Sequence, residues 1–287
     1  MQIGFSFFWP VILGLADPNQ PDAWQRALPP IDETLNHFHK FGIESIEIKL
    51  TEHLSLPLLF QAIEKLVRLG FHVTFHASGR FRFPEDIQAQ LENLSALANF
   101  IKSRFQQQPI IVIHPLNSKT QSRAELMMQT LAYLKQLHGY AGAIPAHFAL
   151  EILRNRADSP KIHIGDSYQE VLDILNRVGD GNWGICWDFG HAIAMYQRGL
   201  QNEFPPPEFI KKVIHCHVHD CSNQKTHLPL GMGSVPIEQN IQLLQQNNYN
   251  GILNLELVPH KIDDPWNFMD YVQQSVARIY QLLKQAK

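Results

Sequence analysis

The chain has 287 residues, of which 45% are hydrophobic and 18% are charged, and its formal net charge is -3 at neutral pH. This composition is typical of a globular protein with a large apolar core, and it excludes an intrinsically disordered chain. The charge gives no overall attraction to nucleic acids or anionic membranes. No apolar run approaches the roughly 18 residues that a membrane-spanning helix needs, so we expect a cytoplasmic protein. The 3 cysteines lie in strand-like segments, which predicts reduced thiols.

Short apolar runs alternate with helix-length amphipathic segments along the whole chain. The predicted strands are Ile3–Phe8, Ser45–Ile48, His72–His76, Ile110–His114, Phe148–Leu153, Gly184–Asp188, Val213–His219 and Ile252–Leu257. The predicted helices are Ile31–Phe41, Pro57–Leu69, Pro84–Phe105, Thr120–His138, Ser167–Val178, His191–Gln197, Pro236–Asn247 and Pro265–Leu283. This alternation predicts one domain over residues 1–287, an α/β fold of the (β/α)₈ or TIM barrel type. A doubly wound sheet is disfavoured because no glycine-rich phosphate turn follows the first strand.

Ionisable side chains mark the carboxyl ends of six predicted strands, namely His76, His114, Glu151, Asp188, His217 and Glu256. In a barrel of this type these ends meet at one mouth. Buried carboxylates must be paired or neutralised, so three of them converging with an imidazole predict a divalent metal ion between them. The oxygen-rich set favours Mn²⁺ or Mg²⁺, with Zn²⁺ or Co²⁺ as alternatives.

Taken singly, each residue has a simpler interpretation. A lone histidine at a strand end is more often a hydrogen-bonded structural residue than a ligand. In the segment IHCHVHD, strand alternation places His215, His217 and His219 on one face and Cys216 on the other. One or two of these histidines can be ligands, and the others can contact substrate or support the ligands. The combination of six strand ends, rather than any one residue, predicts the site.

The strings HAS, IHP, ALE, WDFGHA, HVHD, GMG and LELVP, in this order, resemble the xylose isomerase-like barrels over almost the whole chain. That family includes sugar isomerases, ketose 3-epimerases and endonuclease IV-type apurinic/apyrimidinic endonucleases. The resemblance implies that Glu151, Asp188, His217 and Glu256 hold one divalent metal. It further implies that Glu151 and Glu256 move the proton beside the carbonyl of a small sugar or sugar phosphate, as in an isomerase or epimerase. Arg154 and His219 are candidates for contacting this substrate.

The endonuclease branch of the family is the alternative. It adds metal ligands at the positions of His76, His114, His191 and His227, which here form a candidate second metal or substrate site. Lys225 stands where that branch has an aspartate ligand, which argues against a third metal. Cations in the loops predicted at the mouth are Arg80, Arg82, Lys119, Arg123, Arg154, Arg156 and Lys161. They could contact DNA phosphates or the phosphate of a sugar, or they could be solvated surface.

A barrel that has lost catalysis is the third interpretation, and the intact ligand set argues against it. Nucleic acid is a partner only under the endonuclease alternative. The sequence is compatible with a homo-oligomer and does not specify the number of subunits.

Overall fold

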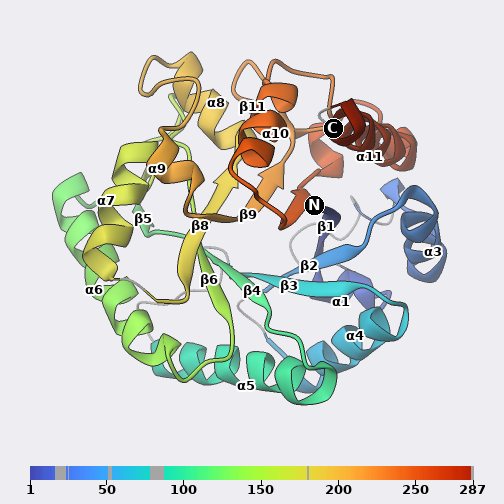
Figure 1. The fold of residues 1–287 in the computed structure, drawn as a ribbon. Coiled ribbons are helices and arrows are strands. Elements are labelled where there is room, and N and C mark those ends of the chain that lie inside the picture. The colour runs from blue at the N-terminus through green and yellow to red at the C-terminus, as the bar shows by residue number, and fades with distance from the viewer. Residues whose placement is uncertain (17–23, 25, 51–53, 78–86, 180, 286–287) are drawn as a thin grey trace.

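A closed barrel of eight parallel strands forms the centre of the protein, in the order β1-β12-β9-β8-β6-β4-β3-β2. The computed structural model describes residues 1–16, 24, 26–50, 54–77, 87–179 and 181–285. The barrel strands are β1 (Gln2–Phe8), β2 (Ser45–Lys49), β3 (His72–Ala77), β4 (Ile110–Ile113), β6 (His147–Glu151), β8 (Trp183–Asp188), β9 (Val213–Val218) and β12 (Ile252–Leu255). The predicted eight strands and the predicted barrel are therefore confirmed (Figure 1).

Helices form a ring around the barrel (Figure 1). They are α1 (Trp9–Ile12), α3 (Ile31–Phe41), α4 (Leu56–Arg68), α5 (Ile87–Phe105), α6 (Arg123–Ala141), α7 (Tyr168–Val178), α8 (Phe189–Gln197), α9 (Pro207–Ile210), α10 (Ile237–Gln246) and α11 (Phe268–Gln285). The 3₁₀ turns η1 (Pro259–Lys261) and η2 (Pro265–Asn267) lie between β12 and α11. The eight predicted helices are present, with boundaries that differ by a few residues.

The differences at helix starts have local causes. α6 begins after Ser122, whose side chain and that of Glu125 form a capping box, so the helix starts later than predicted from Thr120. α8 begins directly after Asp188, whose carboxylate accepts the backbone N–H of His191 at 2.7 Å. Pro265 starts a 3₁₀ turn rather than α11. Pro84, the predicted start of α5, lies outside the described residues.

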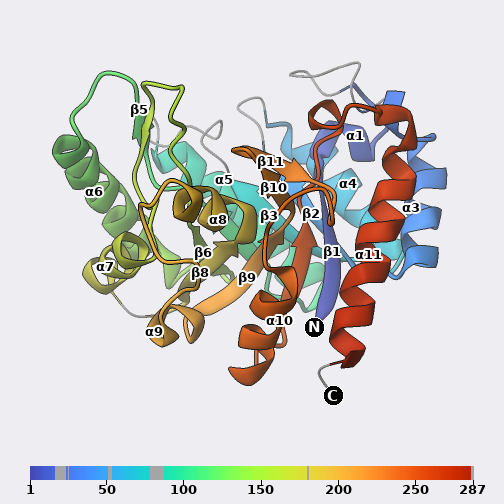
Figure 2. The ribbon, with the colours of Figure 1, turned by 90° about the horizontal axis from the view of Figure 1, so that it is seen from above.

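Two small sheets extend beyond the carboxyl ends of the barrel strands. β5 (Asn117–Ser118) pairs antiparallel with β7 (Ile162–His163), and β10 (Asp220–Ser222) pairs antiparallel with β11 (Lys225–Leu228). In Figure 2 both small sheets lie toward the top of the molecule, whereas the two termini lie toward the bottom. These two sheets and the short helices α1 and α9 were not predicted from the sequence.

The barrel interior changes from apolar to polar along the strands. Val112, Ala149 and Cys186 form a small apolar cluster inside the barrel. Because alternate residues face the same side of a strand, the next inward positions toward the carboxyl ends are His114, Glu151 and Asp188. The larger hydrophobic core fills the space between the barrel and the helices. All three cysteines are buried free thiols, as predicted.

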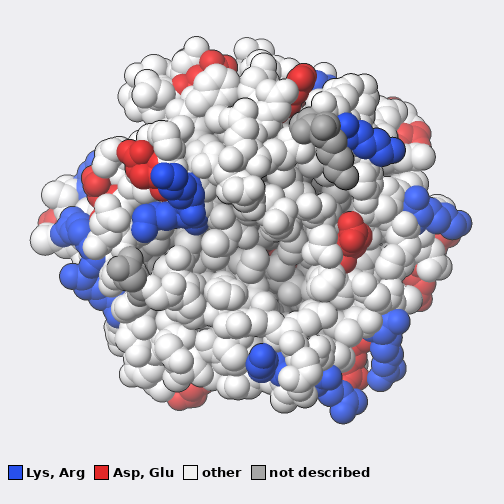
Figure 3. Space-filling view, in the orientation of Figure 1, with Lys and Arg blue, Asp and Glu red and all other residues white. Residues whose placement is uncertain are grey.

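The end of the barrel where the strands begin has few charged side chains at its centre. Figure 3 shows this face, where the chain begins, with Lys, Arg, Asp and Glu mostly toward the rim.

None of the described helices combines the length and the apolar composition that crossing a bilayer requires.

Candidate metal centre

Four ligand atoms converge at the carboxyl end of the barrel. Glu151 ends β6, Asp188 ends β8, His217 lies in β9 and Glu256 follows β12. One ligand atom from each residue lies within 4.8 Å of the others, and all four residues are buried. The Nδ1 atom of His217 lies 3.2 Å from the Glu256 Oε2 atom, 3.6 Å from Glu151 Oε2 and 3.9 Å from Asp188 Oδ2. The structure therefore brings together the four predicted ligands.

This group fits a cation on two observations. The His217 Nδ1 and Glu256 Oε2 atoms are buried and form no hydrogen bond with any described residue, although they face each other. Burial would raise the pKa of Glu151, but His114 and His217 outweigh it and hold the pKa well below its ordinary value. Burial likewise opposes ionisation of Glu256, and Lys49 and His217 hold its pKa well below the ordinary range. Ionised carboxylates around an unused imidazole nitrogen are suited to a divalent metal ion.

Glu47 sets the orientation of His217, and sequence analysis missed it. This fully buried carboxylate comes from β2, and its Oε2 atom lies 3.0 Å from Nε2 of both His215 and His217. Its Oε1 atom accepts hydrogen bonds from Ser6 at 2.8 Å and Asn254 at 3.2 Å. With Nε2 of His217 donating to Glu47, Nδ1 is the nitrogen that faces the other carboxylates. Burial opposes protonation of His217, but these carboxylates raise its pKa, so Nδ1 would give up a proton when it binds a metal.

Charge placement explains how Glu47 stays ionised. Burial would raise its pKa, but His217 and His76 outweigh that effect and hold the pKa well below the ordinary value. The signal in the sequence was the segment SIEIK, where alternation directs Glu47 and Lys49 to the same face.

Lys49 is a second residue that sequence analysis missed. Its Nζ atom lies 2.5 Å from the Glu256 Oε1 atom, and its side chain is only 12% exposed. The ammonium group also lies 5.6 Å from the centre of the Phe8 ring. Lys49 therefore occupies one oxygen of Glu256 and leaves Oε2 facing His217.

His76 and His114 form a neighbouring ligand group that shares Glu151. The Glu151 Oε2 atom lies 2.7 Å from His114 Nε2 and 3.2 Å from His76 Nε2, and the two Nε2 atoms lie 2.8 Å apart. His76 Nδ1 lies 3.3 Å from Glu47 Oε1. Burial opposes protonation of His76, but Glu47 and Glu151 raise its pKa to about 9. The imidazole thus lies between two carboxylates, which favour its protonated form.

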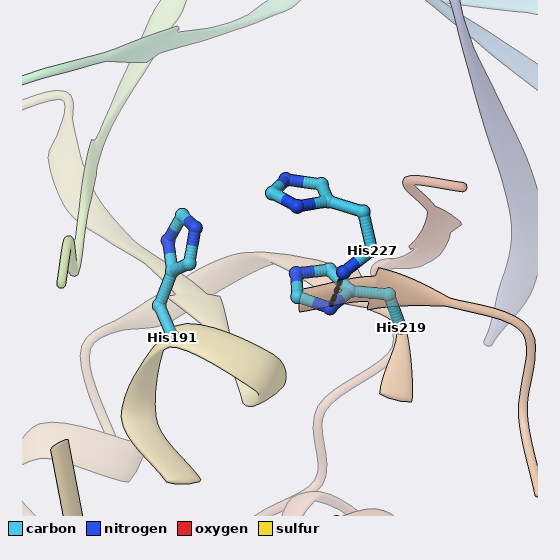
Figure 4. A group of neighbouring side chains, drawn as sticks. All are labelled: His191, His219 and His227. Carbon is cyan, nitrogen blue, oxygen red and sulfur yellow. Dashed lines mark hydrogen bonds between the residues drawn. The ribbon is translucent and has the colours of Figure 1, made fainter. Parts of the chain in front are cut away.

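A third group contains His191, His219 and His227 (Figure 4). His191 Nδ1 lies 3.1 Å from Asp188 Oδ2, and His219 Nε2 lies 3.0 Å from Asp188 Oδ1. The backbone N–H of His227 donates to His219 Nδ1 at 2.9 Å, and the two rings stack with centroids 4.3 Å apart. His227 has a left-handed backbone with φ of 64°. Such a conformation in a residue other than glycine is costly and is often found at functional sites.

Most of the other predicted cations have polar partners in the loops. Arg154 donates from Nη1 to the backbone oxygen of Gln224 at 2.9 Å. Lys225, which replaces the aspartate of the endonuclease branch, forms an ion pair with Asp263 at 3.1 Å. Arg123 forms ion pairs with two carboxylates and Arg156 with one, so these loop cations are compensated. Arg80 and Arg82 lie outside the described residues.

Residues 35–282 match the xylose isomerase-like TIM barrel family, and the chain belongs to this family. A relative in Methanocaldococcus jannaschii, an uncharacterised protein, is 23% identical over 76% of this chain and 75% of its own length. The solved structure of an L-ribulose 3-epimerase superimposes with a TM-score of 0.69 at 16% identity, covering 100% of this chain and 96% of its own. The structure of the IOLI protein with a bound zinc atom superimposes with a TM-score of 0.64 at 14% identity, and the match covers 100% of this chain and 99% of the IOLI chain. At these identities the structures establish a shared fold.

Proposed function

We propose that this protein is a divalent-metal-dependent isomerase or epimerase that moves a proton next to the carbonyl of a sugar-like substrate. The observation that carries the proposal is the group of Glu151, Asp188, His217 and Glu256, with the unused Nδ1 atom of His217 aimed at three carboxylates. The family supports it, and so does the fold shared with an L-ribulose 3-epimerase.

These four residues would hold the metal, with Glu47 behind His217 as the acceptor that fixes its tautomer. Mn²⁺, Mg²⁺, Co²⁺ and Zn²⁺ all suit a site of oxygen ligands and one imidazole nitrogen, and the zinc-binding IOLI protein shares the fold. A bound divalent ion supplies Lewis acidity, which polarises the substrate carbonyl and orients the adjacent hydroxyl group.

Glu151 and Glu256 are the proposed proton-transfer groups. They come from β6 and β12, which are separated in the barrel by β8 and β9, so their carboxylates reach the mouth from different sides. Lys49 binds Oε1 of Glu256, and Oε2 forms no hydrogen bond with any described residue. Glu256 would therefore bind the metal or accept the substrate proton through Oε2, the oxygen that Lys49 leaves open. Glu151 lies between His114 and His191, whose imidazole groups can pass a proton onward or bind a substrate hydroxyl.

Phosphodiester hydrolysis by a metal cluster is the second candidate, favoured by one observation. His76, His114 and Glu151 form an additional ligand group that shares a carboxylate with the first. Metal ions held by these residues would supply an activated water for attack on phosphorus. Under this alternative the partner is nucleic acid.

Metal content and solvent exchange together test the proposal. We expect about one divalent ion per chain in protein purified without chelator. We also expect deuterium from heavy water to appear at the carbon beside the carbonyl of a ketose such as D-tagatose or L-ribulose, measured by NMR. Glu256→Gln should slow this exchange at least ~100-fold, because the proton acceptor is lost. Glu238→Gln, an exposed acid in α10, is the matched control and should exchange normally.

The nuclease outcome would look different. Two or three metal ions per chain, with cleavage of an abasic-site duplex that Glu256→Gln abolishes, would replace the isomerase proposal. Absence of exchange with all ketoses in a metal-loaded protein would also count against it.

A further inference from the structure

A pocket of about 370 Å³ lies among loops that follow the carboxyl ends of the barrel strands. Its walls are the loop after β6, the turn between β10 and β11, and the end of η1. Four cations line it, namely Arg154, Arg156, Lys225 and Lys261, together with the single carboxylate of Asp158. The volume is within the range of about 300 to 1,000 Å³ that is usual for small-molecule sites.

Two of the four cations have no carboxylate partner among the described residues. Arg156 lies 2.6 Å from Asp158, and Lys225 lies 3.1 Å from Asp263, so these two are compensated. The guanidinium of Arg154 contacts only the Gln224 backbone oxygen within hydrogen-bonding distance, and the described part of the chain provides no ion pair for Lys261. Both side chains are partly buried. The pocket therefore contains an uncompensated positive charge.

This arrangement has an electrostatic cost in the free protein. Burial lowers the pKa of Lys261, and the neighbouring Arg154, Arg156 and Lys225 lower it further. Like charges held together in a partly buried pocket repel one another, and an anion between them removes this repulsion.

The pocket is held in shape by a tight hairpin. Asn223 and Gln224 connect β10 to β11 with positive φ values of 48° and 65°, as in the two-residue turns that fit twisted hairpins. The backbone oxygen of Gln224 fixes the Arg154 guanidinium, and the Gln224 side chain donates to the Ala194 backbone oxygen at 2.9 Å. The Arg154 guanidinium is thus placed before a ligand arrives, which reduces the entropic cost of binding.

We propose that this pocket binds the phosphate group of a phosphorylated substrate whose carbonyl end lies at the candidate metal centre. This inference rests on the proposed function and specifies its substrate class, a sugar phosphate. A phosphate monoester carries close to two negative charges, which match the two uncompensated cations, whereas a carboxylate would need only one. The planar guanidinium of Arg154 also suits bidentate binding of phosphate oxygens.

The position of Arg154 connects the pocket to the reaction. It lies on the loop that begins after Glu151, the last residue of β6, and it is close enough to Asp188 for the two charges to interact. Lys225 precedes His227 in β11, and Lys261 follows Glu256 after β12. The segments that carry Glu151, His227 and Glu256 therefore continue directly into the walls of the pocket.

Calorimetric titration of the metal-loaded protein with fructose 6-phosphate and with fructose tests the inference. We expect the phosphorylated sugar to bind at least about tenfold more tightly. Lys261→Met should remove most of that preference while leaving the affinity for fructose unchanged. Lys211→Met, an exposed lysine next to α9, is the matched control and should keep the preference.

The outcomes separate this inference from the proposed function. Solvent exchange on fructose without any preference for the phosphorylated sugar would overturn the phosphate site and leave the isomerase proposal standing. Absence of solvent exchange, together with a preference for the phosphorylated sugar that depends on Lys261, would overturn the isomerase proposal and leave the phosphate site standing. Equal binding of gluconate and fructose 6-phosphate would show that the pocket is a general anion site. Tight binding of an abasic duplex that Lys261→Met weakens would show that the pocket binds nucleic acid. Either result would contradict the inference.

Discussion

Glu47 binds the Nε2 proton of His217 and so leaves Nδ1 as the nitrogen that would bind a metal. Its Oε2 atom accepts from Nε2 of both His215 and His217, and the carboxylate has no exposed surface. Partners of this kind orient metal-binding histidines and raise their basicity. The buried Ser6 and Asn254 side chains hold the other oxygen, so the whole group is fixed before a metal binds.

Replacing Glu47 by glutamine should weaken metal binding without unfolding the barrel. We expect affinity for Mn²⁺ or Zn²⁺ to fall roughly 10- to 100-fold, because the neutral amide stabilises the donating tautomer of His217 less well. Competition with a chromogenic chelator measures the affinity, and circular dichroism checks the fold. Glu44→Gln, at an exposed acid just before β2, is the control. Equal affinities in the two variants would contradict the role of Glu47.

The sequence predicted the site residues unevenly, for a physical reason. Glu151, Asp188, His217 and Glu256 were predicted because each interrupts an apolar run at the end of a strand. Glu47 and Lys49 alternate with isoleucines in SIEIK, a pattern that equally describes a strand with one solvated face. Only closure of the barrel turns that face inward, and closure depends on all eight strands together.

At the scale of elements, the start of α8 and the end of β9 fit closely together. A Cβ atom added to Gly190, in the first turn of α8, would lie 2.0 Å from a ring carbon of His219. His219 in turn contacts Asp188 and accepts the backbone N–H of His227. The absence of a side chain at Gly190 therefore allows β9, α8 and β11 to meet around Asp188.

Gly190→Ala should displace His219 and disturb Asp188. We expect metal affinity and solvent exchange to fall at least ~10-fold, since misplacing a ligand-supporting group has effects of this size. Gly139→Ala in α6 is the control, because a Cβ atom there meets no atom within 4 Å. If Gly190→Ala binds metal as tightly as the control, the contact does not support the site.

Long elements were predicted well and short ones were not. The eight strands and eight principal helices have clear apolar periodicity, which the structure confirms. β5 and β7 have two residues each and α9 has four, too few to show a period. Their positions depend on tertiary contacts, such as the pairing of Asn117 with His163 across two loops.

At the scale of the whole molecule, buried histidines make stability depend on pH. His163 in β7 is partly buried, and burial together with Lys161 and His114 lowers its pKa from 6.5 to about 3. The folded protein therefore holds His163 neutral where the unfolded chain would bind a proton. Its contribution to stability is complete above pH 6.5 and is lost progressively as the pH falls toward 3.

His163→Gln should reduce this pH dependence. Lowering the pH from 7.5 to 5.5 should reduce the free energy of unfolding of the parent protein by about 1 kcal/mol through His163. The figure follows because pH 5.5 lies about one unit below the pKa of an unfolded histidine, and one unit corresponds to about 1.4 kcal/mol. Urea denaturation of the protein and the variant at both pH values measures the difference. His147→Gln, at an exposed histidine, should leave the dependence unchanged. An identical pH dependence in His163→Gln and the parent protein would show that His163 is not the cause.

Metal binding should also stabilise the whole fold. The barrel holds the carboxylates of Glu151, Asp188 and Glu256 close together, and in the described chain only Lys49 and nearby histidines offset their charge. Saturation at 100 times the dissociation constant would add about 2.7 kcal/mol to the free energy of unfolding. We expect Mn²⁺ or Zn²⁺ to raise the unfolding temperature of the chelator-treated protein, measured by calorimetry. Asp188→Asn should lose most of this rise, whereas Asp270→Asn, at an exposed acid in α11, should keep it. An equal rise in Asp188→Asn would place the stabilising ion elsewhere on the protein.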